Sequence, residues 1–161
     1  MLNTFSKVTE ELDSIFQKGK KILFVGIGNV LRKDDGAGVY ISKRIKKSVS
    51  VDSLTVEISI ENYIGKINSL NPDILILIDA IDLGLPPGSV RFLPVTGIKD
   101  LTFNTHNISL KRISEFFNAQ IYILGIQPEN IEFGENISYL VKEKADKIIN
   151  QINTQEVNYG R

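Results

Sequence analysis

Three carboxylates follow apolar runs of the chain at positions where they could carry out hydrolytic or metal chemistry. Asp34 and Asp35 end the polar loop that follows the apolar run 22–25, and Asp79 directly follows the run 74–78. In an open sheet of parallel strands, ligands bind beyond the carboxyl ends of the strands. We therefore expect these carboxylates to lie near one another. Asp79 must also be hydrogen-bonded, paired or coordinated, because a buried charge without partners is costly.

His106, the only histidine of the chain, could complete a metal site with these carboxylates. It follows Asn104 and Thr105 at the expected start of a helix, although a lone histidine is often purely structural. Two carboxylates and one imidazole would leave open positions for water or substrate. Such mixed oxygen and nitrogen donors suit zinc, nickel or cobalt better than calcium.

The acidic pair also has a structural interpretation. An aspartate placed just before a helix beginning near Gly36 can accept hydrogen bonds from the free amides of the first turn. One member of the pair is expected to play this capping role. It does not account for Asp79, which lies at the end of a different strand.

Other chemistries fit the sequence less well. Gly26 and Gly28 begin a dinucleotide-binding pattern, but its third glycine is replaced by Leu31, and two aspartates follow where a pyrophosphate would need free amides. A serine nucleophile lacks the G-x-S-x-G elbow. A receiver-type signalling module also has an acidic pair and a central aspartate. The end of its last strand should carry a lysine, however, where this chain has Gln127.

The elements that must position these residues alternate between strands and helices. Helical spacing of apolar residues predicts helices at 4–18, 36–47, 62–70, 106–117 and 136–152, and apolar runs predict strands at 22–25, 54–60, 74–78, 89–93 and 120–126. This order predicts an α/β three-layer sandwich, with a mostly parallel, twisted sheet of about five strands and helices on both faces. We expect a single domain over 1–161, with a frayed tail at 154–161.

Composition narrows the classes of function. The 161 residues carry 19 basic and 19 acidic side chains, so the chain has no electrostatic reason to bind nucleic acid or an anionic membrane. The absence of cysteine excludes disulfides, cysteine-based zinc sites and a cysteine nucleophile. No apolar stretch approaches the roughly 20 residues that cross a bilayer. We expect a cytoplasmic protein with neither nucleic acid nor membrane as a partner.

Four motifs, in order and at matching spacing over residues 21–152, resemble those of the nickel-iron hydrogenase maturation endopeptidases. They are Gly26-x-Gly28-Asn29-x-Leu31-x-x-Asp34-Asp35-Gly36-x-Gly38, Asp79-Ala80-x-Asp82-x-Gly84 before Pro87-Gly88, Thr105-His106-Asn107-x-x-Leu110, and Leu124-Gly125-Ile126-Gln127-Pro128-Glu129. The last is similar to the branch that serves hydrogenase 3. The segment 57–62 departs from the family, which usually has glycines there, and the helix at 4–18 is an extension beyond the usual start.

The resemblance implies an endopeptidase that removes the C-terminal extension of a hydrogenase large-subunit precursor after nickel insertion. It implies that Asp35, Asp79 and His106 are the metal ligands and the catalytic residues. The nickel would be carried by the precursor, and the purified enzyme could hold an adventitious zinc or cadmium ion. We expect a monomer. A receiver-like module, or a chaperone that holds the precursor without cutting it, remains an alternative.

Five further residues are candidates for binding substrate or supporting the ligands. They are Gly28, Asn29, Asp34, Asp82 and Thr105. Among them, Asp34 or Asp82 could act as a base or orient a ligand. Replacing Asp34 by asparagine is expected to impair processing less than the same change at Asp35.

Overall fold

The computed structural model describes residues 4–16, 19–97 and 110–159. Its strands are β1 (Ile22–Ile27), β2 (Val51–Glu57), β3 (Ile74–Ala80), β4 (Val90–Pro94) and β5 (Gln120–Ile126). Its helices are α1 (Thr4–Ser14), α2 (Ala37–Ser42), α3 (Ile64–Leu70), α4 (Leu110–Ser114) and α5 (Tyr139–Tyr159), with 3-10 turns η1 (Lys33–Gly36), η2 (Ile60–Tyr63) and η3 (Val95–Gly97).

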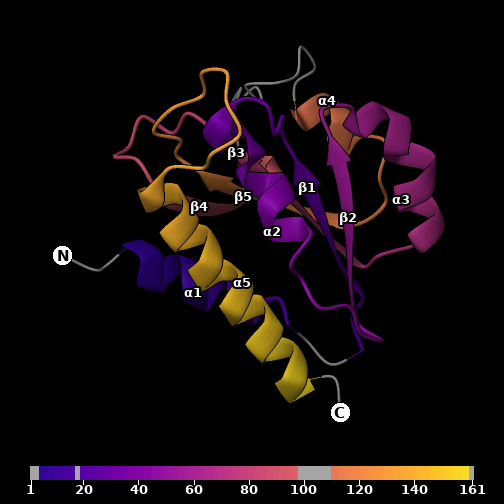
Figure 1. Cartoon of the computed structure of the whole chain (residues 1–161). Coiled ribbons are helices and arrows are strands. Elements are labelled where there is room, and N and C mark those ends of the chain that lie inside the picture. Colours follow the sequence, from indigo (N-terminus) through magenta and orange to yellow (C-terminus); the bar gives the residue numbers. More distant parts are fainter. Residues whose placement is uncertain (1–3, 17–18, 98–109, 160–161) are drawn as a thin grey trace.

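The strands form one sheet in the order β2-β1-β3-β5-β4 (Figure 1). Parallel pairs join β2 to β1, β1 to β3 and β3 to β5, whereas β4 pairs antiparallel with β5 at the edge. The predicted α/β class, with a mostly parallel five-stranded sheet, is therefore confirmed. β3 lies at the centre, and all seven of its residues are buried, as expected for a strand covered on both faces.

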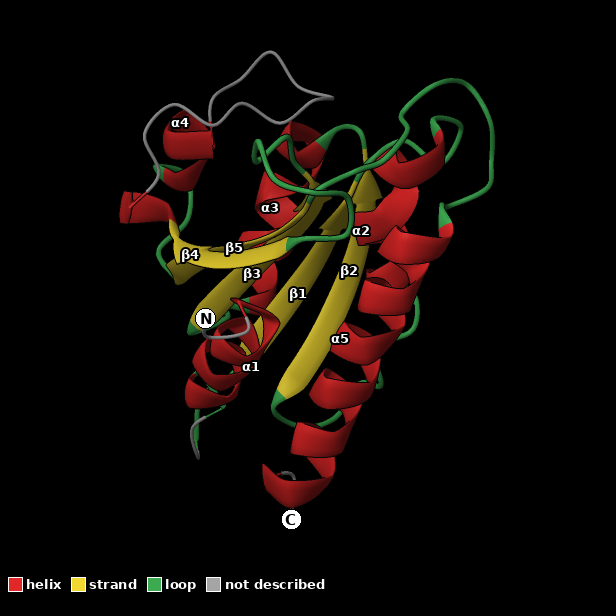
Figure 2. Ribbon diagram, turned by 90° about the vertical axis from the view of Figure 1, so that its left-hand side faces the viewer, coloured by secondary structure: helices red, strands yellow, loops and turns green. Residues whose placement is uncertain are grey.

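Helices cover both faces of the sheet, so that two apolar cores form. Successive side chains of a strand point to opposite faces. On β3, Ile76 therefore packs into the core beneath α1, α2 and α5, while Leu75 and Leu77 pack into the core beneath α3 and α4. Figures 1 and 2 show these layers on either side of the twisted sheet.

The N-terminal helix α1 is part of the larger core. Its residues Val8 and Leu12 are buried, and the helix packs against β4 and α5 (Figure 1). The helical pattern predicted for residues 4–18 is confirmed from 4 to 14. No helix in the described part of the chain is both long and apolar enough to span a membrane.

Some element boundaries differ from those predicted, for reasons that lie in tertiary contacts. The strand expected at 54–60 runs instead from Val51 to Glu57, where a φ of 56° turns the chain out of the sheet. α2 ends at Ser42 rather than near 47. Beyond it, the amide of Lys46 donates to the side chain of Asn153 on α5, so it is not available for a helical bond.

The last helix differs at both ends. α5 runs from Tyr139 to Tyr159, where the apolar pattern predicted 136–152, so residues 154–159 are helical rather than a frayed tail. Just before this helix, Gly134 and Ser138 form hydrogen bonds with Lys33 and Asp34 of the turn that follows β1. These bonds are described with the site.

Candidate active site

Asp79 is the penultimate residue of β3, and its carboxylate is fully buried. Its register partner on β5 is Gly125, which places no side chain beside it. The Oδ1 atom accepts a hydrogen bond from the amide of Ala80 at 2.8 Å, whereas no residue in the described part of the chain donates to Oδ2. Burial raises the pKa of Asp79 well above its usual range, the negative charge of Asp35 raises it further, and the Ala80 amide acts in the opposite direction.

Asp35 lies in the 3-10 turn η1 and is also fully buried. Its Oδ2 atom accepts a hydrogen bond from the amide of Asn29 at 3.2 Å, and among the described residues none donates to Oδ1. Burial raises the pKa of Asp35, while the Asn29 amide and the positive charge of Arg32 lower it. Each of the two aspartates therefore has one buried oxygen without a partner.

Gly28 brings the loop after β1 close to both aspartates. With a φ of 143°, it adopts a backbone conformation that other residues rarely tolerate. A Cβ atom there would overlap the carbonyl oxygen of Asp35 and would lie 3.5 Å from Oδ1 of Asp79. Its amide donates to the carbonyl of Glu57, which fixes the loop to the end of β2. Gly28 thus lies between the two aspartates because it has no side chain.

Asn29 shapes the same loop. Its side-chain Oδ1 accepts the amide of Leu31 at 3.0 Å, and its carbonyl accepts the amide of Arg32. Both bonds hold a tight turn that aims the Asn29 amide at Asp35. The structure therefore gives Asn29 a part in placing Asp35.

Asp34 is buried like its neighbour, but its carboxylate is fully hydrogen-bonded. Its Oδ2 accepts the amides of Glu129 and Asn130 at 2.9 and 3.0 Å and the hydroxyl of Ser138 at 2.8 Å. Its Oδ1 accepts the amide of Ser138 at 2.7 Å. Asp34 therefore joins η1 to the segment 129–138, which we call the Asp34 loop, and to the start of α5.

Asp82 lies in the loop after β3 and is exposed. Its Oδ1 accepts hydrogen bonds from the Gly84 amide at 3.1 Å and from Nε2 of Gln127 at 3.4 Å. The loop is held further by Oε1 of Gln127, which accepts the amide of Leu83 at 2.6 Å and that of Leu85 at 3.4 Å. Asp82 is thus part of a loop that Gln127 organises.

Gln127 and Arg32 have roles that the sequence patterns did not identify. Gln127 is 9% exposed and connects the end of β5 to the loop after Asp79. A signal was available, because a long amide next to Pro128 at the end of an apolar strand must find partners when buried. Arg32 acts on Asp35 through its charge, and its Nε donates to the carbonyl of Ile131.

The paired aspartates suit a cation. Two buried carboxylates that repel each other, each with an oxygen lacking a donor, are stabilised by a positive charge between them. Within the described ranges, no group of three His, Cys, Asp or Glu side chains could hold a metal ion. His106 and Thr105 lie outside these ranges, so the predicted third ligand stays a prediction.

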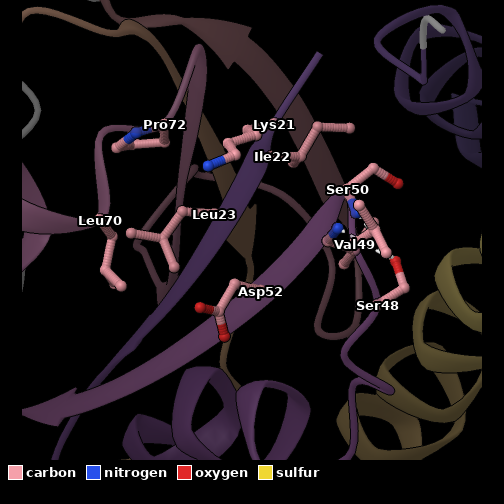
Figure 3. Close-up of a pocket in the computed structure, with 10 residues that line it drawn as sticks. Lys21, Ile22, Leu23, Ser48, Val49, Ser50, Asp52, Leu70 and Pro72 are labelled. Carbon is pink, nitrogen blue, oxygen red and sulfur yellow. Dashed lines mark hydrogen bonds between the residues drawn. The ribbon is translucent and has the colours of Figure 1, made fainter. Parts of the chain in front are cut away.

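A cavity at the opposite edge of the sheet has a different character. It measures about 140 Å³ and lies at the amino ends of β1 and β2, between Lys21, the segment 48–52 and Pro72 (Figure 3). Its carboxylate, Asp52, lies 3.3 Å from the ammonium group of Lys47 and so has a counter-ion. Asp35 and Asp79, in contrast, lie at the carboxyl edge of the sheet and repel each other.

Comparisons with known proteins show the family of the chain. A family model described as hydrogenase maturation protease matches residues 39–155, which is more than half of the chain. The chain belongs to the hydrogenase maturation protease family. The matched range contains Asp79 and His106 but begins after Asp35. As a member of this family the chain is a peptidase, and the comparisons support this function over a receiver-type module.

Individual relatives give the same result. A putative hydrogenase maturation protease of Methanocaldococcus jannaschii is 30% identical over 147 residues, covering 83% of this chain and 86% of the relative. The hydrogenase 3 maturation protease of Escherichia coli is 26% identical over 140 residues, covering 83% and 90%. The crystal structure of the nickel-iron hydrogenase maturation protease HycI from Thermococcus kodakarensis superposes with a TM-score of 0.79 at 30% identity, covering 90% and 97%.

Proposed function

We propose that this peptidase removes the C-terminal extension of a nickel-iron hydrogenase large-subunit precursor after nickel has been inserted. The observation that carries the proposal is the pair of buried aspartates at the carboxyl edge of the sheet, whose backbone or side chain lies beside Gly28. Each has one oxygen, Oδ1 of Asp35 and Oδ2 of Asp79, to which no residue in the described part of the chain donates a hydrogen bond. Membership of the maturation protease family supplies the reaction class and the kind of substrate.

In this proposal, the nickel ion is part of the substrate and not a cofactor of the peptidase. Asp35 and Asp79, together with His106, would hold the nickel ion that the precursor carries, and nickel-free precursor would lack this anchor. A divalent ion there would offset the two negative charges and polarise a nearby scissile carbonyl. Zinc or cadmium in a purified sample would be an adventitious occupant of the same oxygens.

The residues of the chain itself prepare this site. The missing side chain of Gly28 lets its backbone pack against the carbonyl of Asp35 and near Oδ1 of Asp79, and the Asn29 amide donates to Oδ2 of Asp35. Burial keeps water from the carboxylates and so strengthens their attraction for a cation. We further propose that the enzyme works as a monomer in the cytoplasm.

The proposal is tested by mixing the purified protein with matched samples of nickel-loaded and nickel-free precursor and measuring intact masses. Loss of a C-terminal peptide from the loaded precursor alone is the expected result. Asp79→Asn serves as the inactive control. Tight binding of the loaded precursor without any mass change would instead make the protein a chaperone of the precursor. Equal cleavage of both samples would refute the role of nickel.

A further inference from the structure

Asp34 and Asp35 are consecutive residues of η1, and the first determines where the second can lie. The carboxylate of Asp35 has a single hydrogen bond, from the Asn29 amide, so its position depends mainly on the backbone of the turn. The turn itself, in contrast, is held by several hydrogen bonds to the segment 129–138, and most of them involve Asp34.

Backbone hydrogen bonds join the first residues of the turn, and Leu31 just before it, to the Asp34 loop. The amide of Asp34 donates to the carbonyl of Asn130 at 3.0 Å, and the amide of Lys33 donates to the carbonyl of Gly134. The amide of Gly134 in turn donates to the carbonyl of Leu31 at 2.8 Å. With the four bonds of the Asp34 carboxylate, these contacts make the turn and the loop one rigid unit.

The charge of Asp34 is also placed where it is stabilised. The amide and hydroxyl of Ser138 both donate to it, and Ser138 immediately precedes α5, a helix of 21 residues. Helix amino termini favour negative charge. The other two bonds come from the amides of Glu129 and Asn130 in the loop. The carboxylate of Asp34 is therefore stabilised by the loop and the helix start, whereas Asp35 and Asp79 face each other's charge.

We propose that Asp34 is a positioning residue for the peptidase site. It fixes the turn that carries Asp35 against the Asp34 loop and the start of α5, and thereby holds the Asp35 carboxylate beside Gly28 and Asp79. The expected effect of an Asp34 substitution on cleavage rests on the proposed function. Its expected effect on the position of Asp35 is independent of that function.

The experiment compares variants that remove parts of this unit with one that loosens a distant contact. Asp34→Asn removes the carboxylate, Ser138→Ala removes only the hydroxyl donor, and Ser138→Thr keeps that donor. Tyr40→Phe is the matched control, because it breaks the 2.6 Å bond between Tyr40 and Asp146 that joins α2 to α5. All assays are run well below each variant's unfolding temperature, so that every sample is folded.

Two readouts are measured, cleavage of nickel-loaded precursor and hydrogen exchange of single amides. Asp34→Asn is expected to lower kcat/KM by roughly 10- to 100-fold, since small misplacements of reacting groups have effects of this size. Ser138→Ala should lower it by roughly 3-fold. Ser138→Thr and Tyr40→Phe should remain within about twofold of wild type.

Hydrogen exchange reports on the position of Asp35 without any activity. The amide of Asn29 is protected by the Asp35 carboxylate, so it should exchange roughly tenfold faster or more in Asp34→Asn. The amide of Ile22, bonded to Ser50 in the sheet, should be unchanged. Tyr40→Phe should leave both amides as they are.

Each result decides one of the two proposals. If folded Asp34→Asn keeps both wild-type kcat/KM and wild-type exchange at Asn29, the positioning role is refuted. If the wild type does not cleave the precursor, the proposed function fails, and the exchange at Asn29 still decides the role of Asp34. If Asp34→Asn does not fold, the comparison of Ser138→Ala with Ser138→Thr decides it by the same two readouts.

Discussion

Two buried acidic regions lie side by side at the carboxyl edge of the sheet. At Asp34, four donors satisfy both oxygens of the carboxylate, and the result is a firm junction between two loops and a helix. At Asp35 and Asp79, each carboxylate accepts one hydrogen bond from the described residues, and none of these residues donates to its other oxygen. The difference separates a buried carboxylate that joins parts of the scaffold from two buried carboxylates that keep an oxygen for a further partner.

The largest expected effect concerns activity at the unpartnered pair. Asp35→Asn and Asp79→Asn should each lower cleavage of nickel-loaded precursor by roughly 10²–10³-fold or more, the scale of losing a group that stabilises charge at the reacting atoms. Intact mass spectrometry over time measures the rate. Far-UV circular dichroism should show a retained fold, and an unfolded Asp79→Asn protein would give that residue a structural role instead.

The opposite result is expected for stability at the satisfied carboxylate. In Asp34→Asn an amide group would face amide donors at a buried position, so that the part-buried N–H groups of Glu129, Asn130 or Ser138 lose their acceptor. We expect the free energy of unfolding to fall by about 2–4 kcal/mol. Urea denaturation followed by circular dichroism measures this change. A smaller loss for Asp34→Asn than for Asp79→Asn would contradict the comparison between the two regions.

The side-chain amide of Gln127 is a second nearly buried polar group that has hydrogen-bond partners, in the loop after β3. Gln127→Leu removes the acceptor of the Leu83 and Leu85 amides and should lower the free energy of unfolding by about 1–2 kcal/mol. Gln120→Leu is the matched control, because Gln120 makes an exposed bond to Tyr122. The same urea experiment should find the control within about 0.5 kcal/mol of wild type.

The smallest expected effect is the pH dependence of stability at Asp79. Its pKa is higher in the folded state than in the unfolded state, so its contribution to stability is fully present below the unfolded pKa of 3.8 and is lost as pH rises through the folded pKa. In metal-free buffer, Asp79→Asn should therefore gain stability relative to wild type as pH rises. Thermal unfolding between pH 4 and pH 8, at roughly one-unit steps, tests the sign. A constant difference would mean that Asp79 is not destabilised by its charge.

Much of the fold was predictable because it depends on local patterns. The run 74–78 is apolar at every position, and it became the fully buried centre of the sheet. Alternating strands and helices indicated the layered α/β architecture, which the structure confirms. The ends of elements were less predictable, since contacts such as that between Lys46 and Asn153 connect residues 107 positions apart.

For the site, the sequence by itself indicated a kind of chemistry and determined where the aspartates lie in the fold. Asp79 lies at the end of the central strand and the acidic pair ends the loop after β1, so both had to lie at the carboxyl edge of a parallel sheet. The residues alone did not distinguish Asp34 from Asp35, because neighbours in a turn share composition and burial. Only the family resemblance favoured Asp35.

The tertiary structure distinguishes the two aspartates by their hydrogen-bond partners. Asp34 meets donors that lie 95, 96 and 104 positions further along the chain, and Asp35 meets only the amide of Asn29 in its own loop. The physical reason is that a buried carboxylate is stabilised by donors that the fold brings to it. The three distant donors are backbone amides, which almost every sequence position offers alike. Which aspartate becomes part of the scaffold and which keeps a free oxygen is therefore fixed by the path of the distant Asp34 loop.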